Sequence, residues 1–259
     1  MRFRREKGRL GIEKSSSKVH MVEIESIGGG FKVLQYAVIE YLPDGERWAV
    51  AQVKEALAKK RFRAKIARAA LSGPTLHHRI IPLPPMTTRE MDVVVQREVR
   101  REMVSSAERF AYDFQIIGES EEPALKRSEG PLALAVTEAE RVELLAGGVK
   151  RREVLVATAP RRMAEAQRAF AEQCGLRLES LTTIPLTLVN LLQSMESVTA
   201  QRGIGFLYLR QHAGHLVIVN RGRFRFSREF PLGEKVQEEG LAGSEIGQEV
   251  GQTLVDELR

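Results

Sequence analysis

The chain has 259 residues, of which 43% are hydrophobic and 29% are charged, as in an ordinary globular protein of one or two domains. Its single cysteine, Cys174, excludes a disulfide framework and a cysteine metal cluster. No apolar run reaches the ~18 residues of a membrane span, and the basic leader "MRFRREKGR" lacks the apolar segment of a signal peptide. Composition therefore predicts a cytoplasmic protein.

The net charge of +6 raises the question of nucleic acid binding. The basic residues alternate with glutamates or apolar residues, as on solvated helix faces, and only 6% of the residues are aromatic, which leaves few surfaces for base stacking. The pattern does not favour a nucleic-acid partner. The basic leader can lie near an anionic membrane surface or can be a solvated terminus.

The first folded segment is "LGIEKSSSKVHMVEI" at residues 10–24. Apolar residues alternate on both sides of "SSSK", which predicts two strands joined by a tight turn. Such a turn can offer backbone N–H groups and hydroxyls to a phosphate, or it can be a plain hairpin loop.

Further elements of the first half follow from the same patterns. Alternation or extended composition predicts strands at 32–42, 65–73, 75–86 and 110–119. Apolar spacing of three and four predicts amphipathic helices at 49–64 and 87–106, the second with Glu90 closing a capping box. A polar insertion at about 119–150 ends in a short helix at 137–148.

The second half begins with a βαβ pattern and ends with a strand meander. We expect strands at 153–158, 176–183, 204–209, 215–220 and 223–230, and helices at 161–175, 185–195 and 245–259. A strand–turn–strand unit with a polar turn therefore occurs twice, once near each end of the chain.

This duplication resembles the actin-like ATPase superfamily, and within it the PilM family of type IV pilus assembly proteins, relatives of FtsA. The first hairpin matches the family's "LVGIDIGSSSVKAVEL", and later segments match in order, among them "GPTLHHRIIPLPPMTTREM", "YDFQIIG", "EVLVATAPRRMAEAQRAFAEQCG" and "REFPLG". The resemblance implies an α/β, actin-like (ribonuclease H-like) two-lobed fold with an inserted small α/β subdomain. The first lobe would be 1–85 plus 183–202, the inserted subdomain 86–182, and the second lobe, left incomplete, 203–259.

Family members bind ATP and magnesium between the lobes, so the two hairpins would hold the nucleotide. By alignment to the family pattern, the metal-binding aspartate is Glu13, the glycine is Ser15, and Lys18 replaces a serine. In the second hairpin, Tyr208 and Arg210 replace an aspartate and a glycine. If binding is retained, the implied residues are Glu13, Ser15, Ser16, Ser17, Lys18, Gln211, His212, Ala213 and Gly214. Because the second hairpin keeps no carboxylate, we expect no catalytic residue, no metal site and no required cofactor, with an active ATPase as the alternative.

The family also binds the cytoplasmic tail of an inner-membrane protein, PilN, between the first lobe and the inserted subdomain. The residues implied for this groove are Ile80, Ile81, Leu83, Val94, Val95, Arg97 and Arg100. The resemblance implies a cytoplasmic scaffold, associated with the inner membrane through this partner, in a type IV pilus or related secretion or competence platform. A cytoplasmic domain of a type II secretion inner-membrane component is the other binding-protein interpretation, and a homo-oligomer is left open.

Overall fold

The computed structural model describes residues 9–15, 17–28, 30–42, 45–59, 62–102, 109–122, 149–194, 203–210 and 213–231. The chain divides into two compact units. Unit 1 comprises Met1–Leu76, Arg109–Ala111 and Ala159–Arg259, and unit 2 comprises His77–Glu108 and Tyr112–Thr158.

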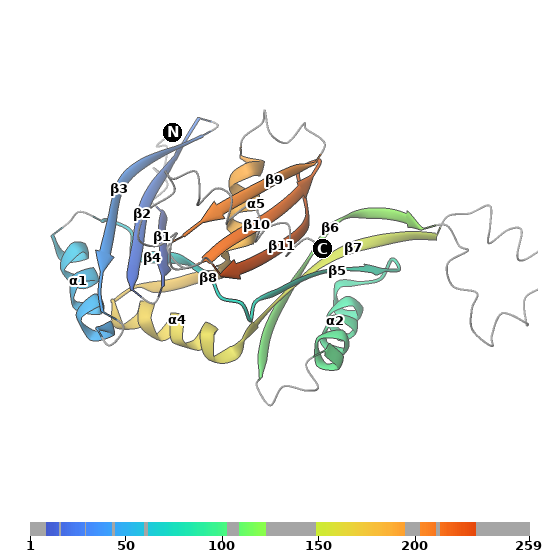
Figure 1. The fold of residues 1–259 in the computed structure, drawn as a ribbon, viewed down its shortest axis with the longest axis horizontal. Helices are drawn as coiled ribbons and strands as arrows, with labels where there is room; N and C mark the ends of the chain where they lie inside the picture. Colours follow the sequence, from blue (N-terminus) through green and yellow to red (C-terminus); the bar gives the residue numbers. More distant parts are fainter. Residues whose placement is uncertain are drawn as a thin grey trace, which may run out of the picture. The chain divides into compact units, whose positions relative to one another are not determined.

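A five-stranded sheet in the order β3-β2-β1-β4-β8 organises unit 1 (Figure 1). Its strands are β1 (Arg9–Lys14), β2 (Lys18–Ile27), β3 (Gly30–Glu40), β4 (Ile66–Leu71) and β8 (Arg177–Thr183). The first three strands are antiparallel, which confirms the predicted first hairpin, and β4 and β8 join β1 in parallel.

The alternation that predicted the hairpin sends one set of side chains to a helix-covered face of this sheet. Helices α1 (Glu46–Ala58) and α4 (Arg161–Gln173) pack their apolar residues against that face. The shared core includes Leu10, Ile12, Val19, Met21, Val53, Leu57, Ala69 and Phe170. The predicted helix at 49–64 was too long, because α1 ends at Ala58, and Phe62 enters the core from the segment that follows.

Unit 1 also contains a three-stranded meander in the order β11-β10-β9. Its antiparallel strands are β9 (Ile204–Leu209), β10 (Ala213–Asn220) and β11 (Arg223–Pro231). Arg221 and Gly222 have positive φ values of 50° and 72°, as a two-residue hairpin turn of the twist-compatible type requires. Helix α5 (Ile184–Gln193) contacts β4 and β8 of the first sheet and β10 and β11 of the second, so it joins the two sheets.

The described residues of unit 2 form a sheet in the order β5-β7-β6 and a helix. The strands are β5 (His77–Leu83), β6 (Phe110–Glu122) and β7 (Val149–Pro160), and the helix is α2 (Thr88–Glu102). The predicted capping box is confirmed: the Thr87 N–H donates to Glu90 Oε2 at 2.8 Å, and the Glu90 N–H donates to Thr87 Oγ1 at 3.3 Å.

The two units divide the chain at residues other than the predicted ones. Strand β5 was expected in the first lobe (1–85) but pairs with β7 of unit 2. Helix α4 and strand β8 were expected in the inserted subdomain (86–182), but β8 pairs with β4 and Phe170 of α4 enters the core of unit 1. The predicted boundaries came from the resemblance to the PilM family, and the chain order β7, α4, β8 does not reveal that α4 and β8 join the sheet and core of unit 1.

Several predictions fall outside the described residues: the leader, the helices at 137–148 and 245–259, and the site residues Ser16, Gln211 and His212. Over the ranges that are described, no helix combines the length and the apolar character needed to cross a membrane.

Candidate functional site

The serine turn between β1 and β2 is held by its own hydrogen bonds. Ser15 Oγ accepts the N–H groups of Lys18 at 3.0 Å and Ser17 at 3.4 Å, and its hydroxyl donates to the Lys18 carbonyl at 3.1 Å. The Ser15 N–H donates to the same carbonyl at 2.8 Å. A phosphate-binding turn leaves its N–H groups free to point at the ligand. Here the Ser15 side chain already accepts two of them.

The neighbouring chain segment also holds this turn. The Tyr41 hydroxyl donates to the Ser15 carbonyl, and the Tyr41 N–H donates to the Ser17 carbonyl at 2.8 Å. Lys18 lies with its Nζ 2.8 Å from Glu40 Oε1. That ion pair directs the lysine charge toward the adjacent strand β3.

Arg210 lies at the centre of the candidate site. Its Nη2 is 2.7 Å from Glu13 Oε1, and its Nη1 donates to Ser72 Oγ at 2.8 Å. The Glu13 contact is an ion pair rather than an aligned hydrogen bond. Both charged side chains are largely buried, with 16% and 17% of their surface exposed. One guanidinium from the β9–β10 turn therefore joins the ends of β1 and β4.

A second carboxylate, that of Glu229 on β11, contacts the residue that follows Ser72. It accepts the Gly73 N–H at 2.8 Å, and the same oxygen is 3.7 Å from His215 Nδ1, its cross-strand neighbour. Burial raises the pKa of Glu229 above its usual value, and the Gly73 N–H and the charge of Arg210 oppose that shift.

Tyr208 on β9 and His215 on β10 are cross-strand neighbours. Their rings stack with centroids 6.1 Å apart at an interplanar angle of 27°. Burial raises the pKa of the Tyr208 hydroxyl, and the charge of Glu13 adds to this effect while Arg210 opposes it. Tyr208 is therefore a neutral group at physiological pH.

A backbone hydrogen bond joins the two described residues that flank the second hairpin turn. The Arg210 N–H donates to the Ala213 carbonyl at 2.8 Å. Gly214 is buried opposite Phe230 on β11, and a Cβ atom at Gly214 would lie 2.6 Å from Phe230 Cε2. The glycine that the resemblance implied for nucleotide contact therefore makes room for an aromatic ring.

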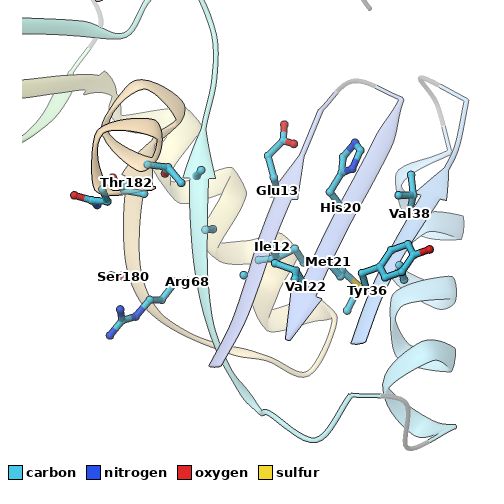
Figure 2. Close-up of a pocket in the computed structure, with 16 residues that line it drawn as sticks. Ile12, Glu13, His20, Met21, Val22, Tyr36, Val38, Arg68, Ser180 and Thr182 are labelled. Atoms are coloured by element: carbon cyan, nitrogen blue, oxygen red, sulfur yellow. The ribbon is translucent and has the colours of Figure 1, made fainter. Parts of the chain in front are cut away.

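A cavity of about 540 Å³ lies over the face of the five-stranded sheet opposite the α1 and α4 core (Figure 2). Figure 2 shows Glu13 on β1, His20 on β2 and Val38 on β3 side by side along its margin. Gly11 and Ala70 contribute to the lining, so small residues leave space above the sheet. Within the described ranges, no three histidine, cysteine, aspartate or glutamate side chains come together as metal ligands.

The residues implied for a partner groove all belong to unit 2. Leu83 on β5 and Val95 on α2 are buried, so these two side chains serve the core rather than a surface. Val94, Ile80 and Ile81 are partly exposed, and Arg97 and Arg100 are exposed. A ligand on this surface would meet Val94 and not Val95.

Sequence reasoning missed Ser72, Gly73 and Glu229. The first two follow β4, the parallel neighbour of β1, and the carboxyl ends of parallel strands lie together at one edge of a sheet. That rule could have placed Ser72 near Glu13. Nothing in the local pattern of "RFRFSREF" distinguishes Glu229 from a solvated residue.

These elements, two sheets linked by α5 with a polar hairpin turn in each, make up the α/β actin-like fold. No protein-family model and no curated protein matches the chain. Among solved structures, the chain is similar to a chain of the PilM-PilN type IV pilus biogenesis complex, with 19% sequence identity, a TM-score of 0.69, and coverage of 97% of this chain and 74% of that one.

Two further solved structures are more distant. The cytoplasmic domain of EpsL, an inner membrane component of the type II secretion system of Vibrio cholerae, has 11% identity, a TM-score of 0.47, and coverage of 90% and 79% of the two chains. A Bacteroides thetaiotaomicron protein with an actin-like ATPase fold and unknown function has 11% identity, a TM-score of 0.44, and coverage of 88% and 71%.

Proposed function

We propose that the chain is an actin-like scaffold of a type IV pilus or related secretion platform. It would work in the cytoplasm, bind the tail of an inner-membrane partner resembling PilN, and not hydrolyse ATP. The observation that carries this proposal is the likeness to a chain of the PilM-PilN complex over 97% of the present chain.

The contacts of Arg210 support the absence of ATP hydrolysis. Magnesium needs free carboxylate oxygens, and Glu13 is the carboxylate aligned with the family's metal ligand. The Arg210 guanidinium already lies 2.7 Å from that carboxylate, so a cation at this place would meet a like charge in a site of low polarity. The closed serine turn supports the same conclusion, because two of its N–H groups have a partner in Ser15.

The exposed side chains of α2 support the binding of a tail. Val94 offers apolar surface, and Arg97 and Arg100 are one turn and nearly two turns further along the helix. An extended peptide with an apolar anchor and acidic neighbours suits such a surface, because the anchor gains by leaving water and the arginines attract its charges. Ile80 and Ile81 on β5 extend the apolar part within unit 2.

The test uses synthetic peptides from the cytoplasmic tails of membrane proteins encoded beside this chain. Val94→Asp is expected to weaken binding of the matching tail at least roughly tenfold, because an apolar contact worth about 1.5 kcal/mol or more is lost. Ile116→Asp is the matched control, since Ile116 is an apolar residue of unit 2 that lies on β6 and is 44% exposed. Circular dichroism must show that both variants are folded.

Charge is tested separately. Arg100→Glu is expected to weaken tail binding at low salt more than at high salt, because salt screens exposed charges. Arg89→Glu, at the first turn of α2, is the control. If folded Val94→Asp and Arg100→Glu proteins bind every tail as the native chain does, the assignment of this surface is wrong.

A further inference from the structure

Strand β3 presents an unusually apolar edge. It ends the order β3-β2-β1-β4-β8, so among the described strands it pairs only with β2 (Figure 1). An edge strand has a row of backbone N–H and C=O groups that can pair with another strand. Natural edges are usually protected by charged side chains, proline or short length. β3 is 11 residues long, and from Val33 to Ile39 it has no charge and no proline.

The side chains of this edge are exposed as well as apolar. Tyr36 is 75% exposed, and Phe31, Val33 and Val38 are each about half exposed. Figure 2 shows Tyr36 and Val38 on β3 beside His20 and Val22 of the neighbouring strand. The apolar surface thus continues across the strand and onto the sheet, which distinguishes it from a single exposed apolar residue.

A bulge limits where another strand can pair. The β2–β3 register shifts between Glu23 and Ile24, which leaves Leu34 as the extra residue of β3. A bulge interrupts the ladder and increases local twist. The uninterrupted segment of β3 is therefore Gln35–Glu40, and its centre is close to Ala37.

The charges at the two ends of β3 identify the occupant. Lys32 lies before the apolar segment, and Glu40, which stays 72% exposed in its ion pair with Lys18, ends it. If a second copy of β3 lies antiparallel to the first, Lys32 of each copy lies near Glu40 of the other. If the second copy lies parallel, Lys32 lies near Lys32 and Glu40 near Glu40, which is unfavourable. Centred on Ala37, the antiparallel arrangement also sets Tyr36 opposite Val38 at two symmetric positions, a favourable aromatic and β-branched pair.

We propose that β3 is a self-association edge, at which two copies of the chain pair antiparallel through Gln35–Ile39 to form a continuous ten-stranded sheet. The paired surface is isologous, so the assembly closes as a two-fold dimer and does not extend into a filament through this edge. Because the interface is small, a dissociation constant on the order of 10–100 µM is expected.

The proposal is tested with the full chain by sedimentation equilibrium over a concentration series. Tyr36→Lys is expected to raise the dimer dissociation constant at least roughly tenfold, since it replaces two symmetric apolar contacts by charge. Leu207→Lys is the matched control, because Leu207 is an exposed apolar residue on β9, an edge strand of the other sheet among those described. It should leave the dissociation constant unchanged.

A charge exchange tests the antiparallel arrangement. Lys32→Glu alone and Glu40→Lys alone are each expected to weaken the dimer, because each places like charges together at both ends. An equimolar mixture of the two variants is expected to recover association, because the heterodimer restores opposite charges at both ends. A chain that stays monomeric at about ten times the expected dissociation constant, a dimer that Tyr36→Lys leaves intact, or a mixture that does not recover would overturn the proposal.

Discussion

Removal of the Arg210 guanidinium is the most informative single perturbation of the candidate site. In Arg210→Ala, Glu13 keeps a carboxylate that is only 17% exposed and loses the cation 2.7 Å away. Breaking a fully buried pair in this way costs about 3–5 kcal/mol. Because these side chains keep some contact with water, we expect a loss of roughly 2–4 kcal/mol in the free energy of unfolding. The lost hydrogen bond to Ser72 is included in that figure.

A double-mutant cycle with Glu13→Gln separates the pair from its surroundings. Urea unfolding followed by circular dichroism gives the free energy of each variant. Arg210→Ala should cost much less in the Glu13→Gln background than in the native one, with a coupling energy of at least about 1 kcal/mol. A coupling energy near zero would refute the reasoning, because it would mean that Glu13 does not depend on Arg210.

Three further predictions concern other buried groups. Gly214→Ala should lower the free energy of unfolding by roughly 2–3 kcal/mol, and Phe230→Leu in the same chain should recover part of it, because the added methyl group then has space. Burial and the charge of His77 lower the pKa of His78 from 6.5 to about 4. The unfolded chain therefore binds a proton that the folded chain does not, and the free energy of unfolding should fall by about 3 kcal/mol as the pH drops from 6.5 to about 4. In His78→Gln, the urea midpoint should change much less with pH over this interval than it does in the native chain. Burial raises the pKa of Cys174 to about 12, so a thiol reagent should label it only in the unfolded chain; labelling at native conditions would contradict this.

The elements that the sequence predicted well were those in which one face is buried. Alternation around "SSSK" gave the β1–β2 hairpin because Leu10, Ile12, Val19 and Met21 all enter one core. The capping box at Glu90 was equally local and was confirmed. Grouping into units was less predictable, because β8 joins β4 across more than 100 residues of chain, and no local pattern encodes that pairing.

The sequence placed Glu13, Ser15 and Arg210 at the candidate site, but it predicted neither their contacts nor the presence of Ser72, Gly73 and Glu229. Alignment to the family pattern placed Glu13 in the first hairpin and Arg210 in the second. It could not show that the two side chains pair, since this depends on the distance between two sheets. Ser15 was aligned with the family's glycine and named as an implied nucleotide-binding residue, yet its hydroxyl oxygen accepts two N–H groups of the turn. Such contacts follow from tertiary packing.

The measurement that tests the central claim most directly is a calorimetric titration of the native chain and of Arg210→Gly with ATP and magnesium. If the Arg210–Glu13 pair takes the place of a metal-bound nucleotide, the native chain should show no binding of ATP at concentrations up to about 1 mM. This limit corresponds to a binding free energy weaker than about −4 kcal/mol. Arg210→Gly, which restores the glycine of the family pattern, should bind more tightly than the native chain. A native dissociation constant of about 10 µM or tighter, or ATP turnover by the native chain that Glu13→Ala abolishes, would contradict the account.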